Sequence, residues 1–188
     1  MVWIIIGIVL VAAIGPVFWL LPSKRDRAQG QLRSAARQAG LVVEIAALPK
    51  VDSRPEERVS AGGKRRDATI DCVAYRLALP RPVPNAPSWL LLKSDRENRY
   101  LEGWTTLSPP SRLPAMQATY WRDIAAVLDG MPGGCAAVEA HTRYVSWYGS
   151  ERLDGDSPET VVGGIREGLQ AIGELHRELD GGTPNRPR

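Results

Sequence analysis

The sequence predicts an α+β protein: an N-terminal transmembrane helix, a short basic juxtamembrane helix, then a mostly antiparallel sheet of about five strands covered by two amphipathic helices. Three observations support this. Residues 2–21 contain no ionisable side chain, residues 41–107 contain short β-type runs separated by Pro, Gly and polar turns, and two segments with helical spacing lie beyond residue 110. A group of strands followed by helices is typical of α+β folds.

The first segment, VWIIIGIVLVAAIGPVFWLL at residues 2–21, is long enough to cross a bilayer. At about 1.5 Å per residue a helix of this length reaches roughly 30 Å. We expect Trp3 and Trp19 to anchor its two ends at the membrane interfaces. A cleavable signal peptide and a buried core helix are the alternatives. The absence of a basic n-region and the bulky residues before Pro22 favour the uncleaved anchor.

The charges after this segment predict its orientation. Five cations and one anion follow it by residue 40, and no Lys or Arg precedes it. The positive-inside rule therefore predicts a single-pass protein of the bacterial inner membrane, with the N-terminus outside and residues 23–188 in the cytoplasm. The cations expected at anionic lipid headgroups are Lys24, Arg25, Arg27, Arg33 and Arg37.

The net charge of the 188-residue chain is +3, and residues 1–40 carry +4 of it. The remainder is therefore slightly acidic, so we expect no nucleic-acid partner. The sequence divides into an anchor (1–22), the basic juxtamembrane helix (23–40), a cytoplasmic α+β domain (41–180) and a disordered tail (181–188). Ser23 is the expected N-cap of the basic helix, with Asp26 completing a capping box, and Gly40 is its expected stop.

Strands are expected at residues 41–48, 68–79, 88–93 and 100–107, with a polar loop over 49–67 and a proline-rich connector over 80–87. A helix is expected within residues 113–132, because Gly130 and Pro132 end its apolar periodicity. Residues 135–149 have the composition of a strand or of a hairpin that turns near residues 141–143. The last helix begins at Asp156 or Ser157, either of which can cap it.

The sequence predicts no metal, cofactor or catalytic residues. His141 and His176 lack ligand spacing, and Lys64 is followed by Arg65 where a phosphate-binding loop needs Ser or Thr. The acidic cluster DGDSPE lacks the further ligands of a calcium loop and is explained by helix capping. Cys72 and Cys135 are expected to be reduced. Cys135 is expected to be a small buried hydrophobe, with a nucleophilic thiol as the alternative.

Two functions remain open. The first is a membrane-anchored, non-enzymatic accessory protein that presents its small cytoplasmic domain to another membrane protein or complex, with the oligomeric state undetermined. The second is a tethered enzyme or ligand-binding module. A deep pocket gathering Glu102, Glu139, His141 or Cys135 favours the second function, and a sheet with a flat exposed face favours the first. An aromatic groove is a further alternative to ordinary core packing of the tryptophans and tyrosines.

The order of an apolar span, GPVFWLLPS, a basic helix and GLVVEI resembles uncharacterised single-span inner-membrane proteins of proteobacteria. Some of these are labelled preprotein translocase subunits of the YajC type. The resemblance covers about the first forty-five residues and implies a translocase-like accessory role. The chain is longer than a YajC-type subunit and lacks the glycine-rich strand motif expected after the span, so the resemblance assigns no functional residue.

Overall fold

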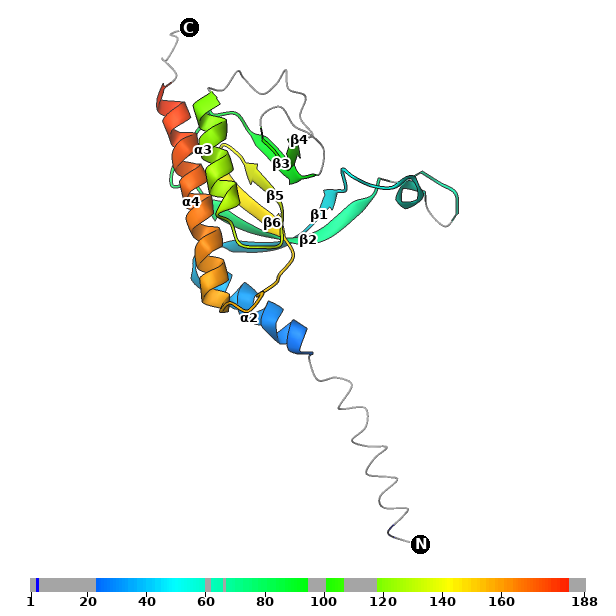
Figure 1. Ribbon diagram of the computed structural model, residues 1–188. Coiled ribbons are helices and arrows are strands. Elements are labelled where there is room, and N and C mark those ends of the chain that lie inside the picture. Colours follow the sequence, from blue (N-terminus) through cyan, green and yellow to red (C-terminus); the bar gives the residue numbers. More distant parts are fainter. Residues whose placement is uncertain are drawn as a thin grey trace.

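The computed structural model describes residues 3, 23–59, 62–65, 67–94, 101–106 and 118–182. In this part of the chain three α-helices lie on one face of a six-stranded antiparallel sheet (Figure 1). The helices are α2 (Lys24–Gln38), α3 (Ala118–Asp129) and α4 (Pro158–Gly182). The strands are β1 (Val42–Pro49), β2 (Thr69–Ala78), β3 (Trp89–Lys93), β4 (Trp104–Thr106), β5 (Cys135–Ala140) and β6 (Tyr144–Gly149). A short 3-10 helix spans Pro55–Arg58.

The predicted fold class needs correction. None of the helices in the described part of the chain is long and apolar enough to span a membrane, against the transmembrane helix in the prediction. The predicted span at residues 2–21 lies outside the described residues, Trp3 excepted, and Trp3 is exposed. The sheet has six strands where about five were expected, because residues 135–149 form a full hairpin. Three helices cover the sheet where two were expected, because α2 packs on the domain.

The sheet order is β1-β2-β6-β5-β3-β4, and every neighbouring pair is antiparallel. The hairpin β5–β6 sits in the middle, and the earlier hairpins β1–β2 and β3–β4 flank it. β1 and β4 are therefore the edges of the sheet. β4 is only three residues long, whereas β1 is eight.

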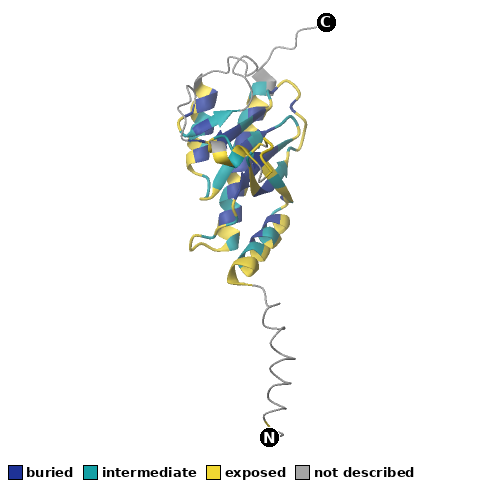
Figure 2. Cartoon of the chain, turned by 90° about the vertical axis from the view of Figure 1, so that its right-hand side faces the viewer, coloured by how far each residue is buried: buried dark blue, intermediate teal, exposed yellow. Residues whose placement is uncertain are grey.

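α2 joins the domain through its small apolar stripe. Ser23 and Asp26 form the predicted capping box, and Gly40, in the left-handed region at φ +80°, follows the last turn. Leu32 and Ala36 are buried against the domain. Exposed residues follow the outer side of the helix (Figure 2). The inner side of α2, which carries these two residues, is therefore a packing surface.

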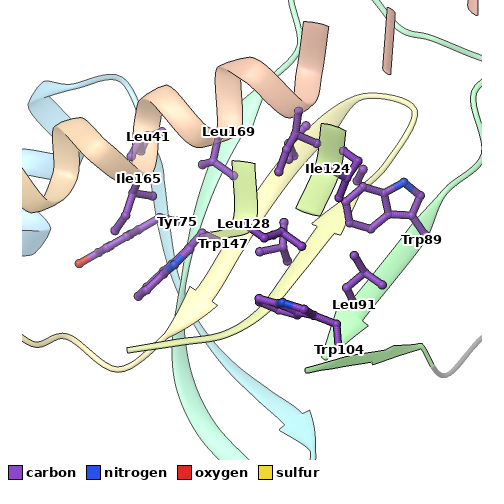
Figure 3. Packing of buried hydrophobic residues seen from close by; sticks show 14 of the residues in the cluster. Leu41, Tyr75, Trp89, Leu91, Trp104, Ile124, Leu128, Trp147, Ile165 and Leu169 are labelled. Atoms are coloured by element: carbon purple, nitrogen blue, oxygen red, sulfur yellow. The ribbon is translucent and has the colours of Figure 1, made fainter. Parts of the chain in front are cut away.

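The main core fills the space between the sheet and the helices. Trp89 and Leu91 of β3 and Trp147 of β6 project toward α3 and α4 (Figure 3). They meet the helical residues Ile124, Leu128, Ile165 and Leu169, and all seven are almost fully buried. These strand residues enter the core because side chains alternate along a strand, so every second residue faces the helices. A smaller apolar cluster on the opposite face of the sheet includes Leu48, Cys72 and Tyr148.

The β1–β2 hairpin extends past the helical layer (Figure 1). Its two strands run in continuous register from Val42 opposite Arg76 to Pro49 opposite Thr69. β6 pairs only with the part of β2 after residue 72, so the outer part of the hairpin has β1 and β2 alone. This outer part carries the polar loop predicted at residues 49–67.

Candidate functional site

The outer edge of β1 is the candidate site. Edge strands leave a row of backbone N–H and C=O groups without a partner strand, and soluble proteins usually protect them with charges, prolines or bulges. β1 is long, regular and poor in such devices. Its one charged residue is Glu44, and Pro49 stands at its last position.

The register shows which backbone groups of β1 point outward. The Lys50 N–H donates to the Ala68 carbonyl at 2.8 Å, one step beyond the last paired residues of β1 and β2. In an antiparallel ladder the mutually bonded pairs alternate with unbonded pairs. Even-numbered residues of β1 therefore bond to β2, and Val43, Ile45 and Ala47 direct their N–H and C=O groups away from the sheet.

The side chains along this edge are apolar and exposed. Ile45, at the middle of β1, is 80% exposed, and Val42 is 50% exposed. Ile45 lies opposite Val73 on the helix-side face of the sheet, but beyond the cover that α2 and α4 give to Val43 and Tyr75. At this exposure the Ile45 side chain buries little apolar surface, so it adds little hydrophobic stabilisation to the folded monomer.

Glu44 does not protect the edge, because it is held by its own sheet. Its carboxylate forms an ion pair with Arg76 of β2 at 3.1 Å, on the face opposite the helices. The Arg76 guanidinium also lies 4.3 Å from the centre of the Tyr144 ring and donates to Ser146 at 3.3 Å. The only charge on β1 is therefore directed inward along the sheet.

A polar and aromatic network continues on that same face. The Glu139 carboxylate accepts hydrogen bonds from the hydroxyls of Tyr148 at 2.5 Å and Tyr144 at 3.4 Å, and His141 stacks on the Tyr144 ring. Burial, followed by the bond to Glu139, raises the pKa of the Tyr148 hydroxyl, so that group stays protonated and donates. Both Glu139 oxygens are occupied within the sheet, and we interpret this network as structural.

The four residues that could have formed a pocket do not come together. Glu139 and His141 are joined through Tyr144, Cys135 contacts the core on the helix side, and Glu102 is exposed in the turn between β3 and β4. Burial raises the pKa of the Cys135 thiol to about 12, while Lys93 and the Trp147 indole lower it less.

Among the pockets lined by described residues, two shallow ones contain none of these four side chains. One, of about 330 Å³, lies between α2 and the start of α4. The other, of about 540 Å³, lies at the base of the hairpin loop, near the ion pair between Lys50 and Glu57. The described residues hold no group of three His, Cys, Asp or Glu side chains that could bind a metal ion. At the acidic cluster, the Ser157 hydroxyl caps α4 by accepting from the Thr160 N–H.

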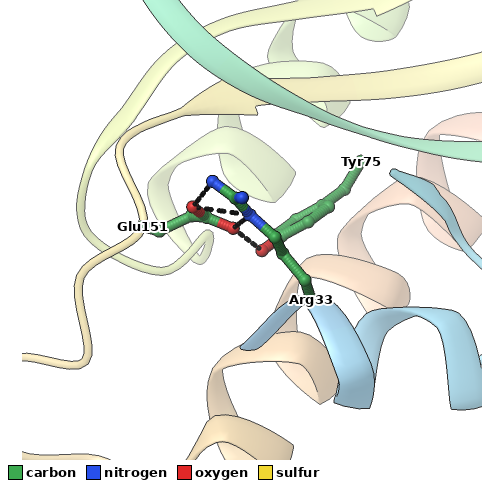
Figure 4. Close-up of polar contacts among 3 residues, drawn as sticks. All are labelled: Arg33, Tyr75 and Glu151. Carbon is green, nitrogen blue, oxygen red and sulfur yellow. Dashed lines mark hydrogen bonds and ion pairs between the residues drawn. The ribbon is translucent and has the colours of Figure 1, made fainter. Parts of the chain in front are cut away.

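The predicted lipid-contacting cations separate into two groups. Four are exposed on α2, namely Lys24, Arg25, Arg27 and Arg37. Arg33 differs, because its guanidinium forms a bidentate ion pair with Glu151, at 2.6 Å for the shortest contact (Figure 4). The Tyr75 hydroxyl donates to the same carboxylate at 2.9 Å. Of the two predicted interfacial tryptophans, Trp3 is exposed and Trp19 lies outside the described residues.

His176, near the end of α4, is a buried core residue. Its Nδ1 lies 3.2 Å from the Tyr120 hydroxyl, which accepts a hydrogen bond from the Trp89 indole at 2.9 Å. This chain of contacts ties α3 and α4 to β3. Burial raises the pKa of the Tyr120 hydroxyl. Trp89 and Tyr120 are therefore core residues and do not line an aromatic groove.

The sequence gives no signal that β1 lies at an edge of the sheet. LVVEIAAL has one charge in eight residues and lacks the polar alternation of a half-exposed strand. Such a run indicates a central strand, yet the topology places it at the edge. Comparisons with protein-family models, characterised proteins and solved structures found no match to this chain. The YajC-type resemblance of the first forty-five residues therefore stays a prediction.

Proposed function

We propose that the protein is a non-enzymatic interaction module that binds a partner protein along the outer edge of β1. The single observation that carries the proposal is the exposed apolar centre of this edge strand, Ile45, on a hairpin that extends past the helices. Addition of a strand to an exposed sheet edge is a common mode of peptide and protein recognition. Main-chain hydrogen bonds supply much of the affinity, and alternate side chains supply the specificity.

The hairpin is suited to this role because the rest of the domain holds it in place. Val43 and Tyr75, at its inner end, pack on the main core. The Tyr75 hydroxyl also joins the part-buried ion pair between α2 and the β6–α4 connection. The inner end is therefore fixed, and the middle of β1 presents Ile45 and the outward backbone groups to another molecule.

Site-specific photo-crosslinking tests this proposal. A benzoylphenylalanine placed at Ile45 of the full-length chain, in the native cell, should give discrete crosslinked proteins on irradiation. A matched control is Glu167, an exposed position on α4 away from the hairpin. We expect adducts from position 45 and few or none from position 167. Equal yields from the two positions, or no adduct from position 45, would contradict a binding role for this edge.

A further inference from the structure

We propose that the partner along the β1 edge is a second copy of this chain, paired antiparallel so that Ile45 lies opposite Ile45 of the other copy. This inference rests on the proposed function, because it names the occupant of the same edge. It joins the two six-stranded sheets into one continuous sheet across a two-fold axis, with the helices of both copies on the same side.

The outward backbone groups fit this register. With Ile45 on the two-fold axis, Val43 of each copy lies opposite Ala47 of the other. These are the residues whose N–H and C=O groups point away from β2, so all of them pair, and about six backbone hydrogen bonds form. Pro49, which has no N–H to donate, falls beyond this ladder.

The side chains also favour a copy of the same strand over a charged peptide. On the helix-side face the pairing brings two Ile45 side chains together, flanked by Val43 and Ala47. On the other face Glu44 lies opposite Ala46 of the second copy, so the two carboxylates do not face each other directly. Each Glu44 remains neutralised by its own Arg76. A charged partner strand would find no free opposite charge on β1, whereas a neutral apolar strand is matched.

The contact is expected to be small and concentration-dependent. Strand pairing over the seven residues 42–48 buries less surface than the roughly 1,200 Å² of a standard stable interface. Covalent capture in cells expressing the full-length chain is therefore a better test than purification. Cysteine substitution suits the geometry, because the two residues at position 45 have Cα atoms about 5.5 Å apart in a hydrogen-bonded pair. That separation is within the range that a disulfide can bridge.

The experiment compares Ile45→Cys with Ala47→Cys under a membrane-permeant thiol oxidant, using two differently tagged copies in one cell. Both positions are exposed on the same face of the same strand. In the proposed register the two residues 47 lie roughly 14 Å apart, too far for a disulfide. We expect a mixed-tag dimer from I45C in at least about tenfold excess over A47C and over the wild-type chain, whose own thiols are buried or half-buried.

The other outcomes each overturn one of the two proposals. If I45C and A47C crosslink equally, the proposed register is wrong. If neither cysteine variant crosslinks but the photo-crosslinker at position 45 captures a different protein, the proposal of a second copy as partner is wrong. The proposal that the β1 edge binds a partner protein then still holds. If neither method captures anything at position 45, both proposals fail.

Discussion

Removing the Arg33 guanidinium should cost the domain far more stability than removing any other cation of α2. Arg33 and Glu151 form the ion pair that joins α2 to the chain after β6, and Tyr75 completes it from β2. The partners differ in exposure. The Glu151 side chain is 1% exposed, whereas the Arg33 side chain is 35% exposed. The two single substitutions therefore leave different groups behind.

Arg33→Ala leaves a buried carboxylate with one remaining hydrogen bond, from Tyr75. Loss of one partner of a fully buried pair costs about 3–5 kcal/mol, and the partial exposure of Arg33 places this substitution at the low end of that range. Glu151→Ala leaves a half-exposed guanidinium that can reach water and a neutral Tyr75 hydroxyl without its acceptor, so the cost should be about 1–3 kcal/mol. The double substitution should cost less than the sum of the two, because no unpaired charge is then left in the core.

Urea unfolding followed by tryptophan fluorescence measures these free energies. Arg27→Ala is the matched control on the exposed side of the same helix, with an expected change within about 0.5 kcal/mol. The reasoning would be refuted if Arg33→Ala cost no more than Glu151→Ala. It would also be refuted if Arg33→Ala cost as little as the Arg27→Ala control.

Three further results are expected. Tyr120→Phe leaves the buried Trp89 N–H without its acceptor and should lower the free energy of unfolding by about 1–3 kcal/mol in the same urea assay, whereas Tyr144→Phe, at a half-exposed hydroxyl, should cost less. Iodoacetamide at pH 8 should alkylate native Cys135 about a thousandfold more slowly than the unfolded thiol, because its pKa is raised from 9.0 to about 12; equal rates by mass spectrometry would refute this. Hydrogen bonds from the Ser23 side chain and backbone lower the pKa of Asp26, so its capping contribution should be complete above the ordinary value of 3.8 and be lost as the pH falls through the lower folded-state pKa. An NMR titration that gave the Asp26 carboxyl a pKa of 3.8 or higher would contradict this expectation.

The local structure was largely predictable from the sequence because it depends on neighbouring residues. Ser23 and Asp26 form the expected capping box. Residues 135–149 form a hairpin that turns near residues 141–143, which is one of the two structures expected for them. Long-range contacts were not predictable from spacing. Arg33 meets Glu151 across 118 residues of sequence, and periodicity carries no information on such a pair.

The position of β1 in the sheet was equally inaccessible to sequence reasoning. Its apolar run suits a strand covered on both sides, but strand order depends on which hairpins pair, and composition does not encode that order. The predicted transmembrane helix rested on the hydropathy of residues 2–21 and on the residues that flank them, and the helices in the described part of the chain do not include one that could span a membrane.

Hydrogen exchange along β1 tests the central claim most directly. The amides of Glu44 and Ala46 bond to β2 in every state, whereas those of Ile45 and Ala47 are protected only if a partner strand occupies the edge. In the full-length chain at high concentration, we expect slow exchange at all four amides. Of these four amides, Ile45→Lys should speed exchange only at positions 45 and 47, because a lysine at position 45 blocks strand addition. Fast exchange at position 47 in the wild-type chain, unchanged by the substitution, would contradict the pairing of two copies along this edge.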